Sequence, residues 1–211
     1  MIIYKIVKIL LSHWVRLFWI ESIEGKENIP DSGAVILAVN HESNLDPLIV
    51  MAVCSRPIIF ATAEWLFRCL FLGLLLRSTK QIEVKKNGAN KEEVISKSLE
   101  VLSQGGILGI FPEGARSKNG LLQPAKSGVG RLALASQAPI VPIGISGSFE
   151  ILPYGKRRPN FNKCRIKIGR PIRAEDYSKY QKLDNGARKL TDELIMFEIA
   201  QLTGEVWPLK N

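Results

Sequence analysis

The sequence has few of the residues on which metal and redox chemistry usually depend. Its 211 residues include three cysteines and two histidines. Cys54, Cys69 and Cys164 lie far apart in mostly apolar surroundings, so we expect reduced core residues in a cytosolic compartment. Because the histidines, His13 and His41, have no close cysteine pair, a zinc site is not expected.

Motifs of several enzyme classes are also missing. The chain contains neither a phosphate-binding Gly-x-x-x-x-Gly-Lys-Ser/Thr loop nor a Gly-x-Ser-x-Gly elbow. Residues 128–133 fit the dinucleotide pattern Gly-x-Gly-x-x-Ala, but the preceding residues 121–127 make a poor strand. That pattern needs a strand directly before it, so we do not expect nicotinamide binding.

No uninterrupted apolar run is long enough to span a bilayer. Residues 1–20 are apolar but lack a small-residue cleavage site. On a helix their polar side chains fall mainly on one stripe, formed by Lys5, Lys8, Ser12 and Arg16. This pattern is typical of a helix lying in a membrane interface; the alternative is a helix packed on the protein's own core.

A second apolar run, residues 65–77, is interrupted by Arg68 and is also too short to span. We interpret it either as a buried helix or as an apolar wall that receives an alkyl chain or dips into lipid.

Positive charge, by contrast, is abundant. The chain has 29 Lys and Arg against 20 Asp and Glu, a net charge of +9. This favours an anionic partner, which could be nucleic acid, anionic lipid or a phosphorylated substrate. Residues 154–173 carry eight Lys or Arg and no acid, and they form either a solvated face or a membrane-facing surface.

Apolar runs and amphipathic patterns alternate along most of the chain. We expect strands at residues 34–39, 57–62, 81–85, 106–111, 139–146 and 164–168, and helices at 48–53, 91–102 and 183–202. This alternation predicts an α/β domain with a mixed, largely parallel sheet flanked by helices. We place that domain at residues 28–211, after a membrane-associating segment at residues 1–27. Pro142 requires an edge strand or a bulge.

An imidazole and a carboxylate follow the strand at residues 34–39. His41 and Asp46 are five residues apart and would diverge on a continuous helix, so only an irregular strand-to-helix turn lets them meet. We expect Asp46 to be the N-cap of a helix whose first residue is Pro47. Asp46 could then accept a hydrogen bond from one ring nitrogen of His41, leaving the other nitrogen as a general base. The alternative is an ordinary loop histidine beside a helix cap.

Glu113 and Arg116 follow the strand at residues 106–111. Ligands collect at the carboxyl ends of parallel strands, so this turn and His41 could face the same crevice. Arg116 would suit a phosphate, with Lys126 adding positive charge. Glu113 could accept a hydrogen bond from a substrate hydroxyl or hold Arg116 in place. A solvated turn with a local ion pair is the alternative.

Three ordered motifs now carry a family resemblance. They are His41-x4-Asp46, the turn Phe-Pro-Glu-Gly-Ala-Arg-Ser at residues 111–117, and Ala-Pro-Ile-Val-Pro-Ile at residues 138–143. In order and spacing the chain resembles the glycerolipid acyltransferases, whose best-known members are the 1-acyl-sn-glycerol-3-phosphate acyltransferases. The resemblance extends from about residue 28 to about residue 173.

The resemblance implies a role for each motif residue. His41 would take the proton of the acceptor hydroxyl and Asp46 would orient it, so that the acceptor attacks an acyl thioester directly. The glycerophosphate part of the acceptor would be bound by residues of the turn and of the segment after it, namely Glu113, Gly114, Arg116, Ser117 and Lys126. Many members carry a Lys in the segment where this chain has Thr62-Ala63-Glu64. If that Lys stabilises the thioester oxyanion in relatives, another donor, such as a backbone amide, must do so here. Ala115 stands where many have Thr.

We therefore expect an acyltransferase that moves a fatty acyl group from acyl-CoA or acyl-ACP to the sn-2 hydroxyl of 1-acyl-sn-glycerol-3-phosphate, making phosphatidate. It would need no metal or cofactor, bind no nucleic acid, and sit peripherally on the anionic cytoplasmic face of the inner or plasma membrane. Acyl carrier protein is a possible partner. The alternatives are a different lysolipid acceptor and a non-catalytic lipid-binding module.

Overall fold

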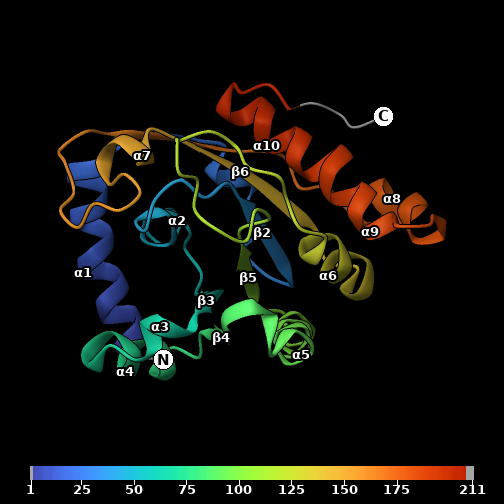
Figure 1. The fold of residues 1–211 in the computed structure, drawn as a ribbon, viewed down its shortest axis with the longest axis horizontal. Coiled ribbons are helices and arrows are strands. Elements are labelled where there is room, and N and C mark those ends of the chain that lie inside the picture. Colours follow the sequence, from blue (N-terminus) through green and yellow to red (C-terminus); the bar gives the residue numbers. More distant parts are fainter. Residues whose placement is uncertain (1, 208–211) are drawn as a thin grey trace.

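One seven-stranded sheet forms the centre of the molecule (Figure 1). A computed structural model describes residues 2–207, with side chains described from residue 11 onward. The strand order is β1-β7-β6-β2-β5-β3-β4. The strands are β1 (Ile20–Glu24), β2 (Val35–Val39), β3 (Ile58–Ala63), β4 (Ile82–Val84), β5 (Ile107–Ile110), β6 (Ile140–Ser146) and β7 (Cys164–Ile168).

The sheet is mixed and largely parallel, as expected. Of the paired strands in the described part of the chain, only β6 and β7 run antiparallel. The six predicted strands are confirmed, each within one residue at either end. β1 was not predicted, because residues 21–24 read as polar; it pairs in parallel with β7 at the edge of the sheet. The sheet therefore starts inside the segment 1–27, whose membrane role stays a prediction.

Helices cover both faces of this sheet. They are α1 (Ile2–Trp19), α2 (Asp46–Val53), α3 (Glu64–Phe67), α4 (Leu70–Ser78), α5 (Lys91–Ser103), α6 (Gly128–Ser136), α7 (Ser148–Ile151), α8 (Ala174–Tyr177), α9 (Gly186–Lys189) and α10 (Met196–Thr203). A π-helical turn, Leu190–Ile195, joins α9 to α10. The predicted helix at 183–202 thus starts later, after Asn185, whose φ of 57° is left-handed.

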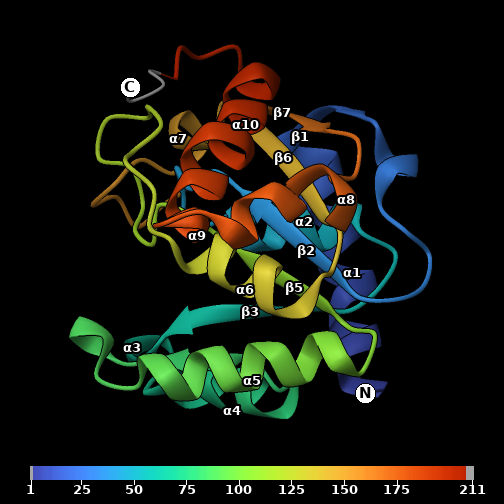
Figure 2. The same ribbon diagram turned by 90° about the vertical axis from the view of Figure 1, so that its right-hand side faces the viewer.

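Alternate side chains of β2 enter two separate cores. Leu37 packs with Ile49 of α2 on one face, whereas Ile36 packs with Val129 of α6 on the other. Figure 2 shows α6, α9 and α10 in front of the sheet and α2 behind it. Burial on both faces explains why β2 is a continuous apolar run and not an alternating one.

Helix α1 packs on the domain and also exposes apolar side chains. Val15 is buried, whereas Trp14 and Leu17 are 61% and 59% exposed. Arg16, which we expected on a basic stripe facing lipid, donates instead to the carbonyl oxygen of Ala52 at 2.6 and 2.9 Å. The predicted stripe positions Lys5 and Lys8 fall outside the described side chains. Within the described residues, no helix is both long and apolar enough to cross a bilayer.

The apolar run at residues 65–77 forms two short helices, α3 and α4, that meet at Arg68. The buried-helix interpretation is wrong, because Leu70 and Phe71 are 81% and 85% exposed. Cys69 lies in the same exposed segment, so the prediction that all three cysteines are core residues is wrong for this one.

Pro142 lies in an interior strand, where the irregularity we predicted is present. Three residue steps separate Ile140 from Ile143 on β6, but four separate their partners Ile168 and Ile172. This slip is a bulge beside Pro142, and it accommodates the missing N–H.

Candidate active site

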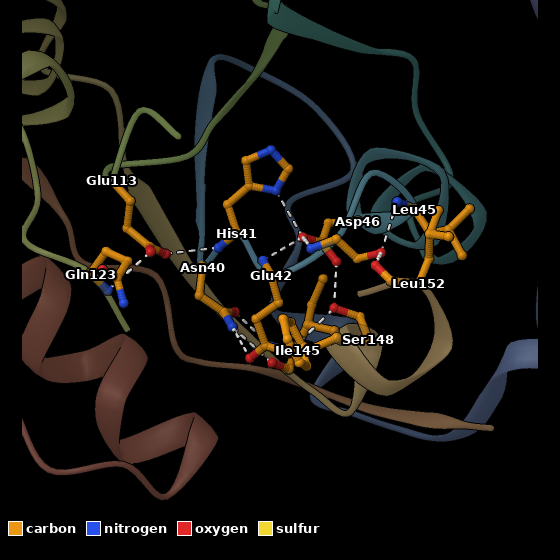
Figure 3. Close-up of polar contacts among 12 residues, drawn as sticks. Asn40, His41, Glu42, Leu45, Asp46, Glu113, Gln123, Ile145, Ser148 and Leu152 are labelled. Carbon is orange, nitrogen blue, oxygen red and sulfur yellow. Dashed lines mark hydrogen bonds and ion pairs between the residues drawn. The ribbon is translucent and has the colours of Figure 1, made fainter. Parts of the chain in front are cut away.

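The ends of three neighbouring strands supply the candidate site. β5, β2 and β6 are parallel and adjacent, and they end at Ile110, Val39 and Ser146. Polar side chains follow each end and converge, as Figure 3 shows. In open α/β sheets, ligands bind outside the carboxyl ends of the parallel strands, which is where these side chains gather.

His41 and Asp46 meet in the turn after β2. Asp46 Oδ2 lies 2.8 Å from His41 Nδ1, and the two side chains are 0% and 16% exposed, respectively. When Asp46 is ionised, Nδ1 must carry the proton, so Nε2 has a free lone pair. In Figure 3 the other ring nitrogen points away from the polar network. The geometry is that of an oriented general base.

Asp46 is not the helix N-cap that we predicted. It is the first residue of α2, and Leu45 occupies the cap position. Its Oδ2 accepts hydrogen bonds from the backbone N–H groups of Glu42 and Ser43, at 2.8 and 2.7 Å. The Asp46 carboxylate therefore lies over the residues that precede it in sequence and closes the turn. This conformation of the turn places the carboxylate beside His41.

The second oxygen of Asp46 has its own donor. The hydroxyl of Ser148, at the start of α7, donates to Asp46 Oδ1 at 2.6 Å. Ser148 is fully buried. Both oxygens of Asp46 are thus held by partners from two different loops, which leaves the carboxylate little freedom to rotate away from His41.

A buried amide and a buried carboxyl support this network. The Asn40 side chain donates to the Ile145 carbonyl and accepts from the Ile145 N–H, both at 2.8 Å, which continues the β2–β6 pairing beyond the strand. Asn40 also donates to Glu42 Oε1 at 2.9 Å. Burial, reinforced by the nearby charge of Asp46, raises the pKa of Glu42 to about 8.

Glu113 connects two loops of the site. Its oxygens accept hydrogen bonds from the backbone N–H of His41 at 2.8 Å and of Gln123 at 3.0 Å. Burial raises the pKa of Glu113 to about 7, although these two hydrogen bonds oppose the shift. The interpretation that Glu113 holds Arg116 is wrong, because no ion pair joins them within the described residues. Contact with a substrate hydroxyl stays a prediction.

Gly114 and Lys126 lie against each other. Gly114 has a φ of 68°, and a Cβ added there would lie 2.9 Å from Cδ and Nζ of Lys126. The Lys126 N–H also donates to the Pro112 carbonyl at 2.7 Å, which holds this segment to the turn. The absence of a side chain at Gly114 therefore gives the Lys126 ammonium its place beside the turn.

Arg116 and Ser117 complete the same turn. The Arg116 guanidinium lies over the ring of Tyr154, 4.8 Å from its centroid, in a cation–π arrangement. The Ser117 N–H donates to the His41 carbonyl at 2.7 Å. All seven predicted site residues thus lie at one edge of the sheet, although their roles stay predictions.

Several residues of the site were not predicted. The His41 ring stacks on Phe111, with centroids 4.0 Å apart, so an aromatic wall fixes the imidazole plane. Ser148, Glu42 and Tyr154 were also missed. Ser148 lies two residues after the predicted strand at 139–146, so extending the strand-end argument to that strand would have found it.

Comparisons with known proteins agree with this architecture. The chain matches the model of the acyltransferase family over residues 22–146. It is 28% identical over 180 residues to the 1-acyl-sn-glycerol-3-phosphate acyltransferase alpha of Ovis aries, which covers 81% of this chain and 61% of that protein. The human protein of the same name is 29% identical, with 81% and 62% covered. The chain thus spans about three fifths of the length of these relatives.

A solved structure also shares the fold. The 1-acyl-sn-glycerophosphate acyltransferase of Thermotoga maritima superimposes with a TM-score of 0.76 at 22% identity, over 98% of this chain and 81% of that one. The family match includes both the His41–Asp46 turn and the Glu113–Arg116 turn. On this match, which covers more than half of its length, the chain belongs to the acyltransferase family.

Proposed function

We propose that this protein transfers a fatty acyl group from acyl-CoA or acyl-ACP to the sn-2 hydroxyl of 1-acyl-sn-glycerol-3-phosphate, forming phosphatidate. The observation that carries the proposal is the hydrogen bond of 2.8 Å between His41 Nδ1 and a buried Asp46 carboxylate. The similarity to proteins named 1-acyl-sn-glycerol-3-phosphate acyltransferases supports it.

In the proposed reaction His41 Nε2 takes the proton from the acceptor hydroxyl as its oxygen attacks the thioester carbonyl carbon. The tetrahedral intermediate collapses with cleavage of the C–S bond, and the imidazolium returns the proton to the leaving thiolate. Asp46 stabilises the imidazolium and fixes its orientation. The step forms one ester, breaks one thioester, and uses no metal or redox cofactor.

The positive groups of the turn would bind the acceptor phosphate. Arg116 offers a planar fork for charge-assisted hydrogen bonds. Tyr154 lies against one face of the guanidinium, so the N–H groups in its plane can still donate to a phosphate. Lys126, held over Gly114, adds a second cation on the same turn. We propose a lysophospholipid with a phosphate headgroup as the acceptor for this reason.

Peripheral attachment to the cytoplasmic face of the inner or plasma membrane is part of the proposal. The exposed Trp14 and Leu17 on α1, together with the net charge of +9, support contact with an anionic bilayer. Acyl carrier protein is the partner that the acyl-ACP donor would require.

The test is acyl transfer by purified protein on liposomes, with a labelled acyl-CoA or acyl-ACP and a panel of lysolipids that differ in headgroup. We expect transfer to lysophosphatidate that is absent in His41→Ala. Transfer only to another lysolipid would keep the chemistry and refute the acceptor. No transfer to any acceptor, with lipid binding unchanged in His41→Ala, would favour a non-catalytic lipid-binding module.

A further inference from the structure

An aromatic cluster covers part of the surface where α1 meets the loop between α7 and β7. This loop, residues 153–163, is called the Phe161 loop below. Phe161 is 82% exposed and lies 6.2 Å, centroid to centroid, from Phe18 of α1. With Trp14, Phe18 and Trp19 it lines a hollow of about 380 Å³. The Trp19 indole N–H donates to the Asn160 carbonyl at 3.2 Å, which holds the loop on the helix.

Exposed aromatic side chains in such a cluster need an explanation, because each leaves apolar area in water at roughly 25 cal/mol per Å². No segment within residues 2–207 covers Phe161, which remains largely in solvent. A partner with an apolar interior would recover this energy.

The charges beside Phe161 indicate which partner. Lys156, Arg157, Arg158 and Lys163 are exposed on the same loop, and none forms a salt bridge in the described part of the chain. Unpaired cations around a projecting aromatic residue suit the interface of an anionic bilayer, where the ring enters the acyl boundary and the cations stay at the headgroups.

Single-stranded nucleic acid also binds basic and aromatic surfaces, but the geometry here fits it less well. Bases stack on free aromatic faces. Trp14 and Phe18 instead stack on each other, with centroids 5.1 Å apart and planes at 12°. The neighbouring exposed residue Leu17 has no ring to stack and no hydrogen bond to offer.

The Phe161 loop also connects to the candidate active site. Tyr154, near its start, is the residue on which the Arg116 guanidinium lies. The helix just before it, α7, carries Ser148, the donor to Asp46. A loop held at the bilayer surface would therefore place the Arg116 side of the site next to the membrane.

We infer that the Phe161 loop is a second membrane-contacting element besides α1, which inserts Phe161 into an anionic bilayer and so brings Tyr154 and Arg116 to the headgroups. The lipid nature of the partner rests on the proposed function. The loop and α1 lie along one side of the molecule in Figure 1, opposite α8 and α9.

Binding of the full chain to vesicles tests this inference without any acyl donor. The variants are Phe161→Ser and the pair Arg157→Glu with Arg158→Glu. Their matched controls lie on the opposite side: Leu183→Ser, which is 43% exposed, and the pair Lys182→Glu with Lys189→Glu, both exposed. The vesicles contain phosphatidylcholine with or without phosphatidylglycerol, and bound protein is measured by sedimentation.

Each loop variant should weaken binding to phosphatidylglycerol vesicles, the charge pair by more than about 25-fold, since each basic residue near the surface contributes about fivefold. The controls should bind like the wild type. Equal losses in a loop variant and its control, or a loss in the charge pair alone, would overturn the insertion of Phe161. A loop-dependent binding of single-stranded oligonucleotide in place of vesicles would also overturn it.

A parallel transfer assay with a short-chain acceptor, monomeric in solution, separates this inference from the proposed function. Phe161→Ser should then turn over like the wild type. If the wild type transfers nothing while the loop variants still lose vesicle binding, the proposed function fails and the membrane contact stands.

Discussion

Ser148 Oγ donates to Asp46 Oδ1 at 2.6 Å, so the carboxylate that orients His41 is itself held from a second loop. Because a hydrogen bond to a charged group contributes at least about 1.5 kcal/mol, we expect Ser148→Ala to lower kcat about tenfold with little change in the acceptor KM. Ser148→Thr keeps a hydroxyl and should retain most of the wild-type kcat. Ser98→Ala, which removes an equally buried hydroxyl from α5, should have no effect on kcat.

A merely structural role for Ser148 predicts a different spectroscopic result. The chain has two histidines, so in a His13→Gln background the ¹⁵N imidazole signals report His41 alone. We expect Ser148→Ala to reduce the fraction of His41 protonated on Nδ1. An unchanged tautomer ratio together with reduced kcat would reject positioning through Asp46.

Removing the base itself should have a far larger effect. We expect His41→Ala and Asp46→Asn each to lower kcat by about 100- to 10,000-fold, the range for loss of general-base catalysis. Binding to vesicles should stay as in the wild type, because neither side chain is on the exposed apolar surface. Single-turnover kinetics with labelled thioester measure the step, and residual turnover above one tenth would exclude His41 as the base.

The phosphate site should respond through substrate binding. Arg116→Ala should raise the KM for lysophosphatidate roughly 10- to 100-fold, since a charge-assisted hydrogen bond is lost, and Lys126→Ala should raise it less. Lys118→Ala, an exposed residue of the same loop, is the control. The comparison is with a lysolipid that lacks phosphate; an equal rise for that acceptor would remove Arg116 from phosphate recognition.

The free energy of unfolding should decrease as pH rises, because of Glu42. Burial raises its pKa to about 8 from 4.5, so the folded state keeps a proton that the unfolded chain releases. The free energy of unfolding therefore decreases as pH rises between these values and levels off above them. Urea unfolding measures the free energy of unfolding at pH 5 and at pH 8.5. The decrease between the two pH values should be up to about 4 kcal/mol larger in the wild type than in Glu42→Gln. Parallel losses would show that Glu42 is ionised when buried.

The N-terminal segment can be tested only in part by truncation. Val15 is buried and Arg16 is bonded to α2, so removal of residues 1–20 would damage the domain. We expect removal of residues 2–10 to weaken vesicle binding, with the melting temperature measured alongside to show that the shortened chain is folded. Undiminished binding would place the anchor on the Phe161 loop or on α4.

Local pattern predicted the strands because buried apolar runs of four to seven residues are bounded by turns, as in β2 and β6. It failed at β1, whose Glu21 and Glu24 face solvent at a sheet edge and mimic a loop. Strand ends likewise located His41, Asp46 and Glu113. The partners of these side chains were not predictable in the same way, since Glu113 binds backbone N–H groups, and backbone groups carry no sequence signal.

Asp46 also shows why a local rule can fail near a functional site. Asp before Pro suggested an N-cap, but the carboxylate bonds the N–H groups that precede the helix. Tertiary demand for a carboxylate beside His41 overrides the local preference. The exposure of α4 was not predictable for a related reason, because length and hydrophobicity alone cannot distinguish a buried apolar helix from an exposed one.

The antiparallel pairing of β6 with β7 has a practical consequence. Since β7 starts at the edge where β6 ends, the chain between them, which includes α7 and the Phe161 loop, leaves and returns at one edge of the sheet. Residues 155–162 lie outside the sheet, so exchanging them for loops of other length or charge would keep the strand order, although it would remove the Asn160 contact to Trp19. Under the membrane contact inferred above, chimeras made there would change the lipid composition that the protein prefers, while the strand ends that carry His41 and Glu113 stay intact.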